Sequence, residues 1–185
     1  MRVSGLVVAG CAALLALTEP ASAVWKGYIS HPLGFAFQSP VEMTPGTAAY
    51  RGTVAGQHRA MVWSATQDNI EYQVMVVDLN AQANQSAALL GEAEYMFQDG
   101  KKLLDDHVDR VETHYGRNLT IDLPNNGGRR LADFYFVNGR LISLQATILP
   151  ANGDYENPDV VRFVDSIAFA LEAAVDDATE LTLPK

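Results

Sequence analysis

The chain has 185 residues, of which 48% are hydrophobic and 19% are charged, and it contains one cysteine. These proportions are typical of one globular domain, and they exclude disordered, collagen-like and disulfide-stapled proteins. Lys and Arg number 13 and Asp and Glu number 22, so the formal net charge is -9. Nucleic-acid-binding modules are usually basic, and we therefore expect no nucleic-acid partner.

The first 23 residues have the three-part layout of a secretory signal peptide. Arg2 supplies a positive charge, residues 6–17 are apolar, and Ala21-Ser22-Ala23 matches an A-x-A cleavage site. The apolar stretch is too short to span a hydrocarbon core of about 30 Å. We predict cleavage between Ala23 and Val24, a periplasmic or secreted location, and no transmembrane span in the mature protein.

Lipid attachment is the alternative processing event. Val8-Ala9-Gly10-Cys11 fits the small-residue pattern that precedes the lipid-bearing cysteine of bacterial lipoproteins. Residues 12–17 remain apolar, however, where a polar tether would follow such a cysteine. Cleavage after Ala23 is favoured, and it leaves a chain without cysteine. Such a chain has no disulfide, thiol nucleophile or thiolate metal ligand.

Four strands are predicted in the first half of the mature chain. They span residues 34–40, 48–54, 58–65 and 70–77, and a proline ends the first of them. The fourth alternates at first and then becomes continuously apolar, as in a strand covered on both faces. Asp68-Asn69 favours a turn directly before it.

A helix is predicted over residues 86–98, with Ser86 as its N-cap and Gly100 beyond its end. Its apolar residues recur at helical spacing: Leu89, Leu90, Ala93 and Phe97. Residues 101–115 fit two structures. Apolar residues at spacings of 4, 3 and 4 favour a helix, whereas the position before two hairpins favours an extended segment.

Three β-rich runs follow, at residues 118–123, 130–137 and 140–149. Residues 125–128 form one connecting loop. Asn138-Gly139 forms the other, because this pair readily takes the positive φ angles of a type I′ turn. The runs therefore predict an antiparallel meander.

A second helix is predicted after a polar loop at residues 150–158, with Asp159 near its N-terminus. Its apolar positions are Val160, Val161, Phe163, Val164, Ile167 and Leu171. The acidic tail, residues 173–185, is expected to fray. This order of elements predicts one α+β domain over residues 24–172, with a single antiparallel sheet of about six to eight strands and two main helices packed on it.

Three segments carry a resemblance to a known family. They are the strand Gly34-Phe35-Ala36-Phe37-Gln38-Ser39-Pro40, the pair Gly116-Arg117 before the meander, and the run Arg162-Phe163-Val164-Asp165-Ser166-Ile167-Ala168-Phe169. With its signal peptide, the chain resembles the PsbP-like fold family, whose bacterial members are mostly small exported domains of unknown role. The resemblance implies that residues 101–111 form a strand, and it implies no catalytic residue.

The sequence contains none of the common catalytic or nucleotide-binding motifs. G-x-S-x-G, the P-loop, G-x-G-x-x-G and H-E-x-x-H are all absent. His107 and His114 are seven residues apart, which separates them on a helix and places them on opposite faces of one strand. We therefore expect no catalytic residue, no cofactor and no specific transition-metal site.

The leading hypothesis is a non-catalytic exported module that binds a protein partner or a small ligand in the periplasm. Arg117, Arg129, Arg140 and His114 are the candidate contacts, as an anionic-ligand or acidic-partner site. The alternative is a periplasmic hydrolase whose acid/base pair, Asp122 or Asp133 with His114, is assembled only in the fold.

Overall fold

The computed structural model describes residues 24–50, 58–80, 84–100, 102–171 and 177–184. The predicted signal peptide and its alternative at Cys11 lie outside the described residues. So do the end of the strand predicted at 48–54 and the first residues of the acidic tail.

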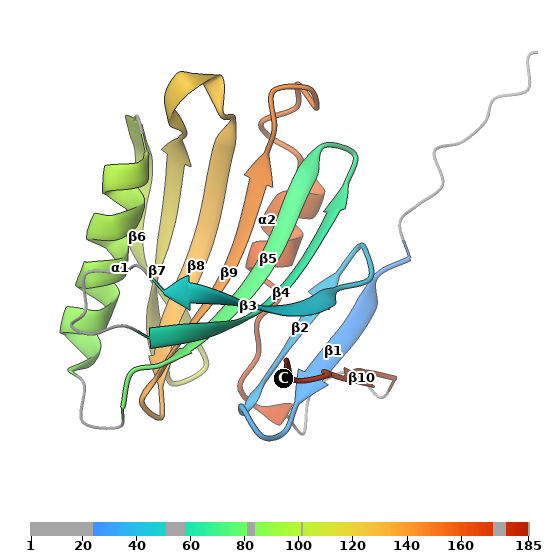
Figure 1. The fold of residues 1–185 in the computed structure, drawn as a ribbon, viewed down its shortest axis with the longest axis vertical. Coiled ribbons are helices and arrows are strands. Elements are labelled where there is room, and N and C mark those ends of the chain that lie inside the picture. Colours follow the sequence, from blue (N-terminus) through green and yellow to red (C-terminus); the bar gives the residue numbers. More distant parts are fainter. Residues whose placement is uncertain (1–23, 51–57, 81–83, 101, 172–176, 185) are drawn as a thin grey trace, which may run out of the picture.

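The main sheet of the described residues has seven antiparallel strands in the order β3-β4-β5-β9-β8-β7-β6 (Figure 1). The first half of the chain contributes β3 (Thr44–Tyr50), β4 (His58–Gln67) and β5 (Ile70–Asp78). The second half contributes β6 (Lys102–Val111), β7 (His114–Asp122), β8 (Arg129–Val137) and β9 (Arg140–Ile148). The two halves join where β5 pairs with β9, and β3 and β6 form the two edges. The predicted α+β class, antiparallel sheet and meander are confirmed.

A second, three-stranded sheet was not predicted. It has the order β10-β1-β2 and contains β1 (Lys26–Ser30), β2 (Phe35–Ser39) and β10 (Thr179–Glu180). Strand β10 pairs in parallel with β1, and the Leu181 N–H donates to the Ile29 carbonyl at 2.7 Å. The expectation of a frayed tail is therefore wrong for these residues, because a distant strand supplies their backbone partners.

Helix α1 (Gln85–Asp99) confirms the first predicted helix, and Gly100 follows its last residue. The predicted cap is wrong: the Asn84 side chain, not Ser86, accepts a hydrogen bond from the Ala87 N–H at 3.1 Å. Either residue type can cap, and only the helix position decides which one does.

Helix α2 (Pro158–Val164) ends well before the predicted Leu171. Beyond it, Ala168 and Ala36 of β2 exchange backbone hydrogen bonds at 2.8 and 2.9 Å. The apolar residue Ile167 is buried as expected, but in this extended segment rather than in the helix. Pairing with β2 thus replaces the last helical turns.

The β6–β7 hairpin settles the ambiguous segment at residues 101–115. The favoured strand is confirmed as β6, and the helix is wrong because β7 satisfies the β6 backbone. The hairpin turn is at Glu112, whose φ is 55°, so β7 begins at His114 rather than at residue 118. The predicted Asn138-Gly139 turn is confirmed by φ angles of 51° and 80°.

The core has two parts, one on each face of the main sheet. On one face, α1 packs its buried Ala88 and Met96 against Leu119 and Phe134. On the other, Phe163 of α2 contacts Tyr72 of β5 with ring centroids 5.1 Å apart, and the small sheet adds its own aromatic residues. The two sheets therefore share the part of the core that lies on the α2 face of the main sheet.

Candidate functional site

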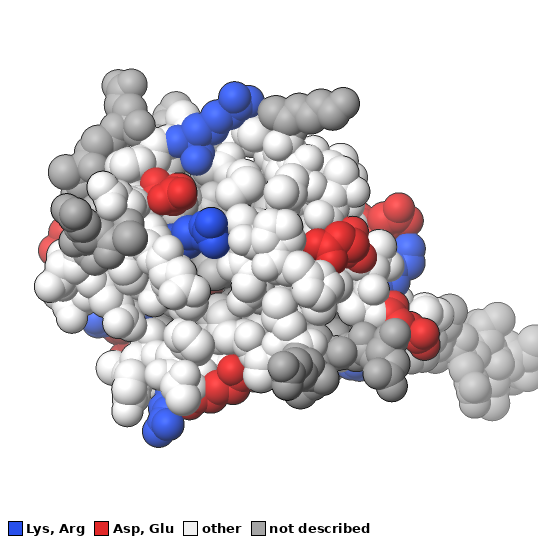
Figure 2. Space-filling view, turned by 90° about the horizontal axis from the view of Figure 1, so that it is seen from below, with Lys and Arg blue, Asp and Glu red and all other residues white. Residues whose placement is uncertain are grey.

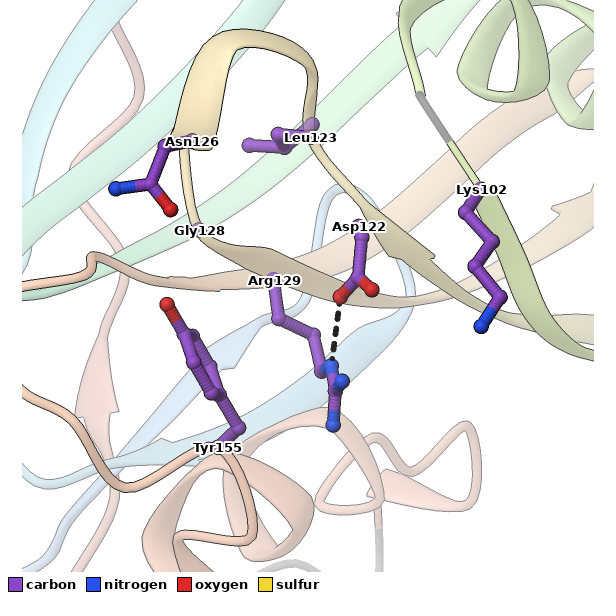
Figure 3. Close-up of a pocket in the computed structure, with 7 residues that line it drawn as sticks. All are labelled: Lys102, Asp122, Leu123, Asn126, Gly128, Arg129 and Tyr155. Atoms are coloured by element: carbon purple, nitrogen blue, oxygen red, sulfur yellow. Dashed lines mark hydrogen bonds and ion pairs between the residues drawn. The ribbon is translucent and has the colours of Figure 1, made fainter.

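The described residues form a cavity with a volume of about 610 Å³ (Figure 3). It lies where β6, β7 and β8 meet at one end of the main sheet, beside the loop that leads to α2. Its lining residues are Lys102, Asp122, Leu123, Asn126, Gly128, Arg129 and Tyr155. Its size is within the range of small-molecule pockets.

A row of three charged side chains crosses the floor of this cavity. Lys102 of β6 is the register partner of Asp122 of β7, and Asp122 is the register partner of Arg129 of β8. Register partners project on the same face of a sheet, so the carboxylate lies between two cations. The sequence separates Lys102 from Arg129 by a whole hairpin, and the strand pairing places them in one row.

The loop before β8 forms the rim of the cavity. Asn125 and Asn126 both have positive φ angles, at 57° and 58°, and Gly128 has a φ of 98°. A Cβ atom at Gly128 would collide with the Ile148 carbonyl oxygen, so only glycine allows this close approach. The loop predicted from these turn residues is confirmed, and it directs Arg129 into the cavity.

Arg129 is held on three sides. Its Nε donates to Asp122 at 3.0 Å and one terminal nitrogen donates to Glu156 at 3.3 Å. Its guanidinium carbon lies 5.1 Å from the centroid of the Tyr155 ring, a cation–π distance. These hydrogen bonds use two of the five N–H donors of a guanidinium, which leaves donors for a ligand.

Lys102 makes no hydrogen bond or ion pair with the described residues, and its side chain is exposed. In Figure 3 its ammonium group and the Arg129 guanidinium extend in the same direction from the sheet, with Asp122 between their bases. Two cations, an aromatic ring and the apolar Leu123 can together hold an anionic group and a planar or apolar group. The described lining residues include no serine, threonine, cysteine or histidine.

Of the four candidate contacts predicted from the sequence, Arg129 alone lines this cavity. Arg117 projects on the opposite face of the sheet, where it makes two hydrogen bonds of 2.6 Å to Asp106. Arg140 lies at the other end of the β8–β9 hairpin and donates to the Pro32 carbonyl at 3.4 Å. His114 packs on Phe169 at 4.6 Å between ring centroids. The fold does not bring the four together.

Lys102 and Tyr155 were missed by sequence reasoning. A lysine at the start of a strand and a tyrosine in a loop carry no local signal of a shared site. Only the pairing of β6 with β7 and the position of the loop before α2 bring them to Arg129.

A second group of polar side chains lies on the α2 face of the sheet. Asp133 is 1% exposed and accepts a hydrogen bond from the Asn118 amide. Burial, and then the charge of Asp109, raises the pKa of Asp133 to about 8. The Tyr135 hydroxyl donates to Asp109, and burial also raises the pKa of Asp165. None of the members of this cluster lines the cavity at Lys102 and Arg129.

The structure does not assemble the acid/base pairs of the hydrolase alternative. Asp122 accepts a hydrogen bond from Arg129 and not from a histidine. Asp133 is opposite Asn118 in the register, four residues along β7 from His114, which corresponds to roughly 13 Å. This geometry lends the hydrolase hypothesis no support.

The expected geometry of the two histidines is wrong in one respect. The turn at Glu112 places His107 on β6 and His114 on β7, and the register puts both on the same face. His114 pairs with Val111, four residues from His107, so roughly 13 Å of strand separates the imidazoles. Among the described residues, no three His, Cys, Asp or Glu side chains are arranged to hold a metal ion.

Two further observations concern the molecule as a whole. No described helix has both the length and the apolar character needed to cross a membrane. At the end of the molecule shown in Figure 2, basic side chains are interspersed with acidic ones and form no continuous basic patch.

No family model matches the sequence, and no curated protein matches it. The fold is similar to that of the cyanobacterial PsbP protein (CyanoP) from Synechocystis sp. PCC 6803, known from a solution structure. The TM-score is 0.55 and the sequence identity is 13%, over 86% of this chain and 98% of that chain. The chain therefore has a PsbP-like fold, as its three motif segments predicted.

Proposed function

We propose that the protein is an exported, non-catalytic binding module, and that the cavity at Lys102 and Arg129 holds a small ligand with an anionic group. The observation that carries this proposal is the row Lys102–Asp122–Arg129 in the cavity of about 610 Å³. Export is supported by the signal-peptide layout of the first 23 residues.

The lining residues define the chemistry of the ligand. The Lys102 ammonium and the remaining Arg129 donors would bind a carboxylate or phosphate group, since charge-assisted hydrogen bonds are the strongest available there. The Tyr155 ring and Leu123 would cover a planar or apolar part of the same molecule. Asp122 would orient Arg129 and keep the net charge of the floor low, which favours a ligand with one negative charge over a polyanion.

Benzoate and benzamide form a matched pair of probes for this site. They share a ring and differ in the anionic group, so we expect benzoate to shift the backbone amide resonances of residues around the cavity in a ¹H–¹⁵N NMR titration. Benzamide should shift them much less. Equal shifts for both compounds, or none for benzoate, would contradict the proposed anionic site.

The variant Lys102→Gln removes the cation that has no described partner. We expect it to weaken benzoate binding by about threefold to tenfold, as for the loss of one charge-assisted contact. Lys26→Gln is the matched control, because Lys26 lies elsewhere and pairs with Glu42 at 3.0 Å. If the control weakened binding as much as Lys102→Gln, the effect would come from net charge and not from the cavity.

Cleavage of the predicted signal peptide tests whether the protein is exported. Mass spectrometry of the protein recovered from the periplasm is expected to find an N-terminus at Val24 without lipid. A lipid-modified Cys11 at the N-terminus would instead make the protein a lipoprotein. Recovery of the unprocessed chain from the cytoplasm would contradict export.

A further inference from the structure

Strand β6 is an exposed edge of the main sheet. It pairs with β7 on one side, and no described strand pairs with its other side. All its residues are exposed except Asp109 and Val111, which are half-buried. Every second residue of such an edge directs its N–H and C=O groups outward, where another strand can pair with them. A register irregularity between Leu103 and Asp105 confines the regular edge to residues 105–111.

The α1 side of this edge has an apolar groove beside the charged residues Asp106 and Arg110. A groove of about 190 Å³ runs between α1 and β6, with Leu90 and Phe97 of α1 on one wall and Leu103 of β6 on the other. Val108 is 70% exposed on the same face, and Phe97 is 56% exposed. Three charged residues also line the groove: Asp106 and Arg117 form an ion pair with each other, and Glu94 lies on α1.

The α2 side of the same edge is acidic. Asp105, His107 and Asp109 project there, because their register partners Thr120, Asn118 and Gly116 lie on that face. The Asp105 side chain is 58% exposed. A strand that paired with β6 would therefore meet Val108 and the apolar groove on one face and the Asp105 and Asp109 carboxylates on the other. Asp106 and Arg110 lie on the first face, and His107 lies on the second, 2.9 Å from Asp105.

We propose that the edge of β6 binds an extended segment of a partner protein in which apolar and basic residues alternate. The segment would extend the main sheet, direct its apolar residues toward α1, and direct its Lys or Arg residues toward Asp105 and Asp109. The carboxylates of Asp105 and Asp109 favour a basic segment as the occupant, because opposite charges on paired strands attract each other. Sedimentation distinguishes this occupant from a second copy of the chain.

A seven-residue peptide of alternating Lys and Val, blocked at both ends, is the probe. We expect it to bind at least about tenfold more tightly, by fluorescence polarisation, than a Glu–Val peptide or a peptide with its Lys and Val in separate blocks. Hydrogen exchange should slow at alternate amides within residues 105–111. If the peptide whose Lys and Val residues stand in separate runs bound equally well, the interaction would be non-specific charge attraction. That result would overturn the proposal.

Two variants locate the contact. Val108→Lys should weaken binding of the Lys–Val peptide by about tenfold or more, whereas Val161→Lys, at a 45% exposed residue of α2, should not. Asp105→Lys should transfer the preference toward the Glu–Val peptide. Unchanged binding in both β6 variants would overturn the proposal. So would a concentration-dependent dimer in sedimentation that Val108→Lys abolishes, because the edge would then belong to a second copy. These results are independent of the benzoate titration, which probes other residues.

Discussion

Asp133 is a carboxyl group that the fold removes from water. Burial raises its pKa to about 8, and the neighbouring Asp109 charge acts in the same direction. The pKa in the unfolded chain is about 3.9, so between these two values the folded state binds the proton and the unfolded state does not. The contribution of Asp133 to the free energy of unfolding is therefore fully present below about pH 4, and it is lost as the pH rises toward about 8.

The variant Asp133→Asn tests this assignment, because asparagine keeps the shape of the neutral acid and cannot ionise. We expect equal stability of variant and wild type near pH 4.5, and a more stable variant at pH 8. Between these values the difference should grow by up to about 1.4 kcal/mol per pH unit. Urea denaturation across this pH range measures it.

The exposed Glu94→Gln is the control for that pH series, and its profile should follow that of the wild type. If Asp133→Asn were less stable than the wild type at pH 8, the Asp133 carboxylate would be ionised and required there. The raised pKa would then be wrong.

Strand β10 shows what a very short element can contribute. It has two residues, yet it continues into Leu181, which is 5% exposed in the core, and Thr182. The Trp63 indole donates to the Thr182 carbonyl at 2.8 Å, which ties the end of the chain to β4. The C-terminal segment is therefore part of the fold and not an appendage.

We expect Leu181→Ala to destabilise the protein by about 2–4 kcal/mol, the usual cost of a cavity in a core. Leu183→Ala is the matched control, since Leu183 is 40% exposed and should cost less than about 0.5 kcal/mol. Thermal unfolding followed by circular dichroism compares the two. A similar small effect in both variants would show that the segment does not stabilise the core.

At the scale of the whole molecule, the two sheets are joined by one aromatic core. Phe37 of β2 stacks on Tyr28 of β1 with centroids 5.2 Å apart, and it meets the Phe163 ring of α2 edge-on at 6.4 Å. Phe163 in turn contacts Tyr72 of the main sheet. Neither sheet can expose its inner face without disrupting the other.

The shared core predicts one cooperative unfolding transition for the mature protein. Far-UV circular dichroism reports on both sheets, and tryptophan fluorescence reports on Trp25 beside the small sheet and Trp63 in the main one. The two urea curves should coincide. An earlier fluorescence transition would show instead that the small sheet unfolds separately.

Local chemistry explains which elements could be predicted from the sequence. The Asn138-Gly139 turn, the strand that ends at Pro40 and the helix before Gly100 depend on residues close together in the chain. Turn propensity, alternation and helical spacing act at that range, so the α+β class and the meander followed from them. The three motif segments carried the resemblance to the PsbP-like fold.

Only the tertiary structure decided the end of α2, the pairing of β10 with β1 and the row formed by Lys102, Asp122 and Arg129. In each case the deciding partner is distant in the sequence: Ala36 for the segment after α2, Ile29 for Leu181, and neighbouring strands for the charged row. A two-residue strand has no periodicity to detect, and a charged residue at a strand end looks the same whether it faces solvent or a cavity. Backbone pairing between distant segments settles both, because every buried N–H and C=O must find a partner.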